Sequence, residues 1–348
     1  MQRIRAALPA FKHETVLSFA YLRSGVAAWA FDDHGVNFAW IAGSSEELAT
    51  RVRNFNHLCS DPYSDLATLR QQGRILYDLL LAPFDRHLEP SRILIVEPDS
   101  ILSDVPWQAL VDPQGEYLGN RFAIVVSPGL GYWLELRSPA AISPETTTLV
   151  VGMPAVASLV ASRYPRLPDA DREARSVASQ FRHSRLLSGT EATSPAIQQA
   201  LSRSQVFHFA GHAVSGVKQS GLVLASVTGP DGDDDEPTLL SASDLDKALL
   251  QRLQLVVLSA CTTAETEKGF TGPDTLVRGF LRAGVPHVVA SRWPVDSPTT
   301  EQTMTEFYKA LFQGQPSTKA LQQAANTLRL QPGTSHPYYW AAFGSYGR

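Results

Sequence analysis

The chain has 348 residues, of which 44% are hydrophobic and 18% charged, a composition typical of a globular protein with one large or two medium domains. Its net charge of −4 at pH 7 argues against nucleic acid as the main partner, because phosphate groups bind best to a basic surface. No apolar run approaches the roughly 18 residues that span a bilayer, and no signal peptide is apparent. With only two cysteines, a disulfide scaffold is disfavoured, and we expect a cytoplasmic protein that binds neither membranes nor nucleic acid.

A stretch rich in proline and serine at residues 137–145 is the predicted boundary between two parts of the chain. We therefore expect an N-terminal part over residues 1–143 and a C-terminal part over residues 144–348. The N-terminal part is predicted to open with strands, including a hairpin whose turn is the segment DDHG at 32–35, and to continue with two helices. Its expected strands are 15–21, 26–31, 36–40, 92–97 and 122–126, and its expected helices are 46–58 and 66–81.

The C-terminal part alternates regularly between strand-like and helix-like segments. Ser194 and Ser297 each precede a proline and are the predicted N-caps of two of its helices. Such alternation predicts a mostly parallel sheet with helices on both faces, and hence an α/β fold. The expected strands are 148–153, 205–210, 221–225, 253–259, 286–291 and 338–344, and the expected helices are 171–181, 245–250, 274–283, 297–312 and two that begin at 194 and 317.

Two of these strands lead to reactive side chains, His212 and Cys261. In an open parallel sheet, ligands bind at the carboxyl ends of the strands, so an imidazole and a thiol are delivered to one edge. A thiolate attacks as a nucleophile, and a nearby imidazole accepts the thiol proton. The interval of 49 residues between the two also matches the His-to-Cys spacing of about 50 in caspases. The backbone amides of Cys261 and Ala213 are the expected donors to the oxyanion of a tetrahedral intermediate.

These residues also have an ordinary structural interpretation. A cysteine at a strand end is often a small buried hydrophobe, and a histidine in an apolar run is often a satisfied core residue. We assign His208, inside its strand, to the core, and expect His212 just past the strand end at the sheet edge. No acidic residue is clearly placed to orient His212, so the pattern favours a dyad over a triad, with a backbone carbonyl as the orienting group.

Several ordered segments resemble the CHAT domain family, a caspase-related module often joined to tetratricopeptide repeats. The segment HFAGH at 208–212 resembles the histidine motif of this family, and the segment LSAC at 258–261 resembles its cysteine motif. The resemblance covers nearly the whole chain, and motifs in a fixed order are more specific than any one of them. The other matching segments are LYDLLLAP at 76–83, IVEPDSILSDVPWQAL at 95–110, SGLVLA at 220–225, FLRAGVPHVVASRWPVD at 280–296, FYKAL at 307–311 and HPYYWAAF at 336–343.

This resemblance implies the fold of the caspase, separase and gingipain clan of cysteine peptidases, a three-layer α/β/α sandwich with a mostly parallel sheet. It assigns the catalytic histidine to His212 and the catalytic cysteine to Cys261. It also implies that residues 1–143 form an inactive caspase-like part beside a catalytic domain at 144–348. Two departures from the family pattern are Ala213, where glycine is frequent, and the pair Thr262 and Thr263 after the cysteine. Neither removes a catalytic group.

The segment 291–296 follows a predicted strand and should reach the same edge as the dyad. In caspases the corresponding segment pairs with the substrate backbone as an additional strand. We expect Ser291, Arg292, Trp293 and Asp296 to bind substrate, with Trp293 as a pocket wall and Asp296 as its negative charge. A packing role for Trp293 and a helix-cap role for Asp296 are the alternatives.

The other features are assigned to structure. Trp107 and Trp340 lie in apolar segments and are expected in the core, and Cys59 is expected to be structural. The acidic run at 231–236 is interpreted as a solvated loop, with a regulatory or docking loop as the alternative. No metal-ligand spacing and no phosphate-loop lysine are apparent, so we expect neither a metal nor a cofactor.

The sequence therefore predicts a cysteine endopeptidase that cleaves one or a few partner proteins through His212 and Cys261. Two alternatives remain, a catalytically silent scaffold that binds partners and a hydrolase that uses Cys261 on a small molecule. Residues 262–272 contain glycine, threonine and charges without an apolar period, so we expect a mobile loop there. Ordering of this loop by a regulatory partner, such as a tetratricopeptide-repeat protein, is the expected mode of activation.

Overall fold

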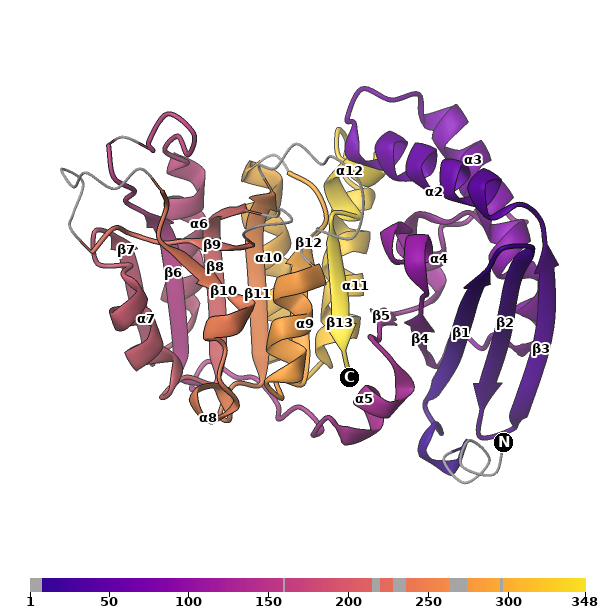
Figure 1. The fold of residues 1–348 in the computed structure, drawn as a ribbon, viewed down its shortest axis with the longest axis horizontal. Helices are drawn as coiled ribbons and strands as arrows, with labels where there is room; N and C mark the ends of the chain where they lie inside the picture. The colour runs from indigo at the N-terminus through magenta and orange to yellow at the C-terminus, as the bar shows by residue number, and fades with distance from the viewer. Residues whose placement is uncertain (1–7, 159, 215–219, 228–235, 263–273, 295–296) are drawn as a thin grey trace. The chain divides into compact units, whose positions relative to one another are not determined.

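The computed structural model describes residues 8–158, 160–214, 220–227, 236–262, 274–294 and 297–348 (Figure 1). Its internal contacts divide the chain into two compact units. The first unit comprises residues 1–134 and 321–342, and the second comprises residues 135–320 and 343–348. The chain thus leaves the first unit near residue 134 and returns to it for a short segment close to the C-terminus.

The first unit is built on a mixed sheet in the order β5-β4-β1-β2-β3. Strands β5, β4 and β1 are parallel, whereas β1, β2 and β3 form an antiparallel meander. The predicted hairpin is confirmed, because Asp32 pairs with Gly35 and the Asp32 carboxylate accepts the backbone N–H of His34 at 2.8 Å. The strands are β1 (Glu14–Leu22), β2 (Gly25–Asp32), β3 (Gly35–Ala42), β4 (Ile93–Glu97) and β5 (Ile124–Val126).

Helix α3 of the first unit buries an apolar stripe. Leu69, Leu76 and Leu80 of α3 are fully buried, and Asp65 caps this helix by accepting the Thr68 N–H at 2.7 Å. Trp107 is also fully buried and stacks on Phe19 of β1 with 5.5 Å between ring centroids. The helices are α2 (Ser45–Ser60), α3 (Leu66–Leu80), α4 (Leu118–Arg121), α5 (Leu130–Glu135), which ends at the unit boundary, and α12 (Pro337–Trp340).

The second unit has the predicted parallel sheet, in the order β7-β6-β8-β11-β12. Strand β13 extends it antiparallel to β12, and β9 pairs with the last two residues of β8, beyond the point where β6 ends. The strands are β6 (Thr148–Pro154), β7 (Ser184–Gly189), β8 (Val206–Val214), β9 (Gly221–Val223), β10 (Leu239–Ser241), β11 (Leu255–Thr262), β12 (His287–Ser291) and β13 (Phe343–Gly347).

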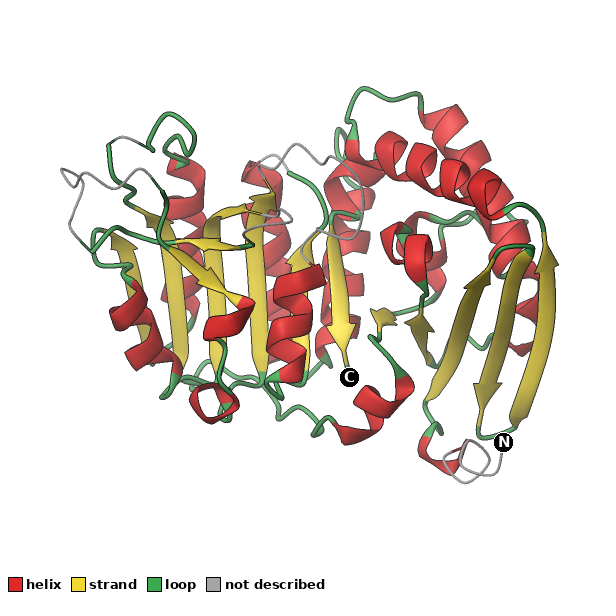
Figure 2. Cartoon of the chain, in the orientation of Figure 1, coloured by secondary structure: helices red, strands yellow, loops and turns green. Residues whose placement is uncertain are grey.

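Helices cover both faces of this sheet, as Figure 2 shows. Consecutive residues of β8 demonstrate the layering, because Phe207 contacts Phe280 of α9 while His208 contacts Tyr308 of α10. The predicted α/β/α sandwich with a mostly parallel sheet is therefore confirmed. The helices are α6 (Pro168–Gln180), α7 (Ser194–Leu201), α8 (Lys247–Leu250), α9 (Asp274–Arg282), α10 (Ser297–Phe312) and α11 (Ser317–Arg329), the last of which continues into the first unit.

Two local predictions were wrong, and strand β7 was missed. The last strand was expected over 338–344 but runs over Phe343–Gly347, because Pro337 starts a short helix that the His336 ring caps by accepting the Tyr338 N–H at 3.1 Å. Thr193 rather than Ser194 occupies the N-cap position of α7. Strand β7 was not predicted, because it is an edge strand with one buried residue, Leu187, and therefore lacks an apolar run.

Candidate active site

His212 and Cys261 lie directly opposite each other on neighbouring parallel strands, β8 and β11, which run side by side in Figure 1. The register runs without a shift from Val206 opposite Leu255 to Ala213 opposite Thr262. Adjacent strands are about 4.8 Å apart, so the two backbones are as close as neighbouring strands allow. Both residues lie inside their strands. The expectation that His212 follows its strand was wrong, because pairing with β11 and then β9 continues β8 to Val214.

The His212 imidazole is oriented by a backbone carbonyl. Its Nε2 atom lies 2.7 Å from the carbonyl oxygen of Pro165. A carbonyl oxygen can only accept a hydrogen bond, so Nε2 carries the proton and the neutral ring has a free lone pair on Nδ1. The Nδ1 atom is buried and has no hydrogen-bond partner among the described residues. This tautomer is the one in which Nδ1 can accept a proton.

The segment that supplies Pro165 follows β6 and packs over the end of β8. Tyr164 contacts the His212 ring edge-on, with 5.6 Å between centroids, and belongs to an apolar cluster with Ala157, Val160 and Val223. Just before this segment, near the end of β6, Met153 adopts a left-handed backbone conformation with φ of 39°. Such a conformation costs free energy for a side chain other than glycine and occurs most often next to functional sites.

The other predicted site residues lie near these strand ends. Ala213 is buried and stands opposite Leu222 of β9 as well as Thr262 of β11. The Ser291 hydroxyl donates to the carbonyl of Ala260 at 2.8 Å and so ties the end of β12 to β11 just before Cys261.

The segment after β12 is described only in part. Trp293 is 4% exposed, and the Arg292 guanidinium lies 6.0 Å from the centroid of the Tyr346 ring. Asp296 lies outside the described residues, as do most of the acidic run at 231–236 and the loop that follows Thr262.

His208 is fully buried and hydrogen-bonded through both ring nitrogens, which confirms its assignment to the core. Its Nδ1 atom is 3.0 Å from the Tyr308 hydroxyl, and its Nε2 atom is 3.1 Å from the Glu173 carboxyl group. The second oxygen of Glu173 accepts the Ser259 hydroxyl at 3.0 Å. Sequence reasoning missed Glu173, although its place on the buried stripe of α6 with Ala170, Ala174 and Val177 was an available signal.

In the first unit, three side chains are arranged like metal ligands, but the positive charge beside them is that of an arginine side chain. Ligand atoms of Asp32, Asp33 and His34 lie within 4.8 Å of one another. The Arg92 guanidinium is buried beside them, 2.8 Å from Asp33 and 3.2 Å from Glu89. Its positive charge neutralises the acidic turn, so we assign no metal to it.

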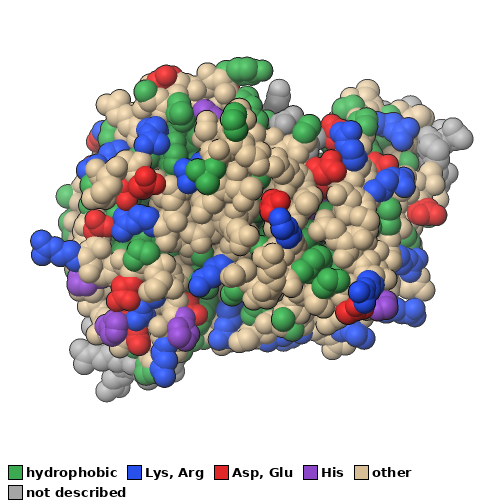
Figure 3. All heavy atoms as spheres, turned by 180° about the vertical axis from the view of Figure 1, so that it is seen from behind, with side chains coloured by type: hydrophobic (Ala, Val, Ile, Leu, Met, Phe, Trp, Pro, Cys, Tyr) green, Lys and Arg blue, Asp and Glu red, His purple; other side chains and the backbone are tan. Residues whose placement is uncertain are grey.

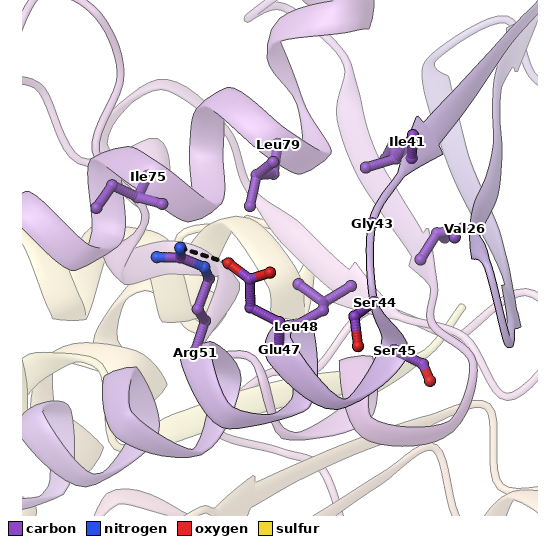
Figure 4. Close-up of a pocket in the computed structure, with 12 residues that line it drawn as sticks. Val26, Ile41, Gly43, Ser44, Ser45, Glu47, Leu48, Arg51, Ile75 and Leu79 are labelled. Carbon is purple, nitrogen blue, oxygen red and sulfur yellow. Dashed lines mark hydrogen bonds and ion pairs between the residues drawn. The ribbon is translucent and has the colours of Figure 1, made fainter.

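A cavity of about 160 Å³ also lies within the first unit, between the β2–β3 hairpin and helices α2 and α3 (Figure 4). Its lining is mostly apolar and includes Val26, Ile41 and Leu48. The Glu47 and Arg51 side chains meet beside it in an ion pair of 2.8 Å. Among the described residues, none of those predicted to act in catalysis or substrate binding lines this cavity.

The comparison with known families agrees with the motifs. The sequence matches the CHAT domain over residues 70–348. The chain belongs to the CHAT domain family. This CHAT chain is 29% identical to tetratricopeptide repeat protein 28 of Mus musculus and 28% identical to that of Homo sapiens, over 78% of the chain in each case. It spans only 13% of the length of either relative.

Among solved structures, the CHAT chain is similar to separase of Saccharomyces cerevisiae in its complex with securin. In one such structure the TM-score is 0.58 at 10% identity, and the match covers 99% of this chain and 30% of the other. In a second the TM-score is 0.54, with 99% and 31% covered. At this identity the likeness concerns the fold, which is that of the caspase-like peptidases.

The surface of the CHAT chain carries both signs of charge. Figure 3 shows lysine and arginine side chains interspersed with aspartate and glutamate side chains over one face. This mixture agrees with the small net charge of −4. No described helix combines the length and the hydropathy that a membrane crossing requires.

Proposed function

We propose that this CHAT chain is a cysteine endopeptidase in which Cys261 is the nucleophile and His212 the general base. One observation carries the proposal: His212 stands opposite Cys261 in the strand register, with the Pro165 carbonyl on Nε2 and an unpartnered Nδ1 among the described residues. A backbone carbonyl is sufficient to fix the tautomer, so the base needs no carboxylate. Membership of a family with the caspase-like fold supports the same assignment.

In the proposed reaction, His212 Nδ1 takes the proton from the Cys261 thiol, and the thiolate attacks the carbonyl carbon of the scissile peptide bond. The oxyanion that forms accepts hydrogen bonds from the backbone amides assigned to this role, those of Cys261 and Ala213. The C–N bond then breaks, and the leaving amine takes the proton from the imidazolium. Water, deprotonated by His212, hydrolyses the thioester and regenerates the thiol.

The substrate in this proposal is an extended segment of another protein that lies along residues 291–296. Ser291 and Trp293 have buried side chains. In this proposal, Ser291 would contribute to substrate binding by positioning the backbone, and Trp293 would form a wall of the substrate pocket. Arg292 and Asp296 are the proposed polar contacts to the substrate. The activating partner would be a tetratricopeptide-repeat segment or another regulatory protein, in keeping with the names of the relatives.

Labelling with a thiol-directed peptide electrophile tests this proposal, with Cys59 as an internal control in the same molecule. Cys59 is fully buried in α2, so the folded chain should be labelled at Cys261 only, as read by peptide mass spectrometry. The His212→Ala variant should lose the labelling while remaining folded. If Cys261 is not labelled with or without a regulatory partner, the chain is a scaffold, and if a non-peptide electrophile reacts as fast, a small-molecule hydrolase is favoured.

A further inference from the structure

A buried polar network links four elements of the second unit. Tyr308 of α10, His208 of β8 and Glu173 of α6 are each 4% exposed or less. Glu173 bridges the two strands that carry the proposed catalytic pair, because one carboxyl oxygen contacts His208 of β8 and the other accepts from Ser259 of β11. Ser259 precedes Cys261 by two residues, and His208 precedes His212 by four.

Two groups, the protonated Tyr308 hydroxyl and the Glu173 carboxylate, determine which atom donates in each hydrogen bond of this network. Burial and the charge of Glu173 raise the pKa of Tyr308 well above its usual value, so the phenol keeps its proton and can donate to His208 Nδ1. His208 then donates from Nε2 to Glu173, and Ser259 donates to the second oxygen. Every polar atom in this chain of bonds has a partner, which is the condition under which a buried network rigidifies a core.

The segment that leads into helix α6 supplies the group that orients His212. Pro165 precedes the first residue of α6 by three positions, and its carbonyl accepts from His212 Nε2 at 2.7 Å. The segment 165–173 is thus attached to β8 at two points, His212 and His208, which are about 13 Å apart along the strand. On the neighbouring strand β6, Gly152 approaches α6 so closely that a β-carbon there would overlap Cβ of Ala174. The helix therefore has little freedom to shift against the sheet.

We infer that Glu173 is a positioning residue: by fixing α6 on β8 and β11, it keeps the Pro165 carbonyl on His212 Nε2 and so holds Nδ1 as the base. This inference rests on the proposed role of His212. Glu173 does not touch the reacting atoms. Because the role of Glu173 is geometric, a glutamine at this position should preserve it. The glutamine amide oxygen can accept from His208, and its NH₂ group can donate to a rotated Ser259 hydroxyl.

The test measures the tautomer of His212 by NMR of the ¹⁵N-histidine-labelled chain, together with the rate of Cys261 alkylation. The wild-type chain should show a single neutral tautomer with the proton on Nε2. In Glu173→Ala this tautomer should become mixed, and alkylation should slow on the order of tenfold, because small displacements of catalytic groups are costly. Glu173→Gln should restore both signals.

Ser345→Ala is the matched control. Ser345 is hydrogen-bonded to His287 Nε2 at 2.8 Å, so this variant also removes one of the two hydrogen-bond partners of a buried histidine in the second unit. It should lower stability without changing the His212 tautomer. If Glu173→Ala does not fold, Glu173→Asp, which keeps the charge but shortens the reach, must shift the tautomer in the same direction.

A folded Glu173→Ala or Glu173→Asp chain with the wild-type tautomer and alkylation rate would overturn the inference, as would an equal effect of Ser345→Ala. If the proposed function is wrong, the result is different: Cys261 is alkylated no faster in the wild-type chain than in His212→Ala. The tautomer readout does not depend on catalysis, so the two failures are distinguishable.

Discussion

Both units of the chain contain parallel strands, but the side chains near the ends of those strands differ. In the first unit, β4 ends at Glu97, whose carboxylate accepts the Ser18 hydroxyl at 2.6 Å, and β5 ends at Val126. In the second unit, β8 and β11 carry His212 and Cys261 in register near their carboxyl ends. The sheet positions whatever side chains the sequence places at its edge, so the architecture alone does not make a reactive site.

The largest expected effect tests this difference at the strand ends directly. Cys261→Ala and His212→Ala should each lower kcat/KM for a cleaved peptide on the order of 10³-fold or more, because each removes a reacting group. The control in the first unit, Ser18→Ala, removes the hydrogen bond to Glu97 at the end of β4 and should leave kcat/KM unchanged. A loss in Ser18→Ala comparable to that in His212→Ala would show that the first unit takes part in the chemistry.

The variant Trp107→Ala, in the core of the first unit, tests whether this unit affects the site in the second unit. Trp107 is fully buried against Phe19, so Trp107→Ala should lower the free energy of unfolding by about 3–5 kcal/mol. Denaturant unfolding followed by fluorescence measures the change. Under conditions where the variant stays folded, the alkylation rate of Cys261 should equal that of the wild-type chain. A slower rate would mean that the first unit supports the geometry of the site.

The second unit should respond to acid through His287. Burial lowers the pKa of this residue to about 4, so the folded state stays neutral while the unfolded chain binds a proton below its usual pKa of 6.5. The stabilisation is therefore present above about pH 6.5 and is lost as the pH falls toward 4, to the extent of roughly 3 kcal/mol. Unfolding at pH 7 and pH 4.5, compared between wild type and His287→Gln, measures it. An equal loss of stability in the variant would contradict this account.

The smallest effect is expected at the edge strand β3 of the first unit. Val36, Phe38 and Trp40 are 40–60% exposed on this strand, and the Phe38 ring contacts Trp29 of β2 with 5.5 Å between centroids, so Phe38→Ser should lower the free energy of unfolding by only about 1 kcal/mol. The same change should reduce self-association, since an exposed apolar edge strand pairs readily with other chains. Thermal unfolding and light scattering measure the two effects. A loss of several kcal/mol would contradict this expectation, because it would require packing of Phe38 beyond its contact with Trp29.

Much of the fold could be predicted because apolar runs and turn residues mark its elements. The hairpin at Asp32–Gly35 and the buried strands β8 and β11 follow from local pattern alone. Strand β7 could not, because an edge strand needs few buried residues. The helix at Pro337–Trp340 was missed because three aromatic residues favour a strand, whereas a proline and the His336 cap start a helix.

The site was predictable only where its residues belong to the strands. His212 and Cys261 stand out because each ends an apolar run, and their register follows from parallel pairing. Pro165 could not be predicted, since it acts through a backbone carbonyl that any residue has. Glu173 acts through contacts to His208 and Ser259, which lie 35 and 86 positions away in the chain. Partners this distant in sequence are found from tertiary packing and not from spacing.

A search for new protein N-termini in cells that express the chain tests whether His212 and Cys261 cleave peptide bonds. These cells are compared with cells that express Cys261→Ala or His212→Ala. Expression in cells provides any partner that activation requires. The account predicts a small set of new N-termini that is present with the wild-type chain and absent with both variants. New N-termini that persist in Cys261→Ala, or a wild-type set identical to that of both variants, would contradict it.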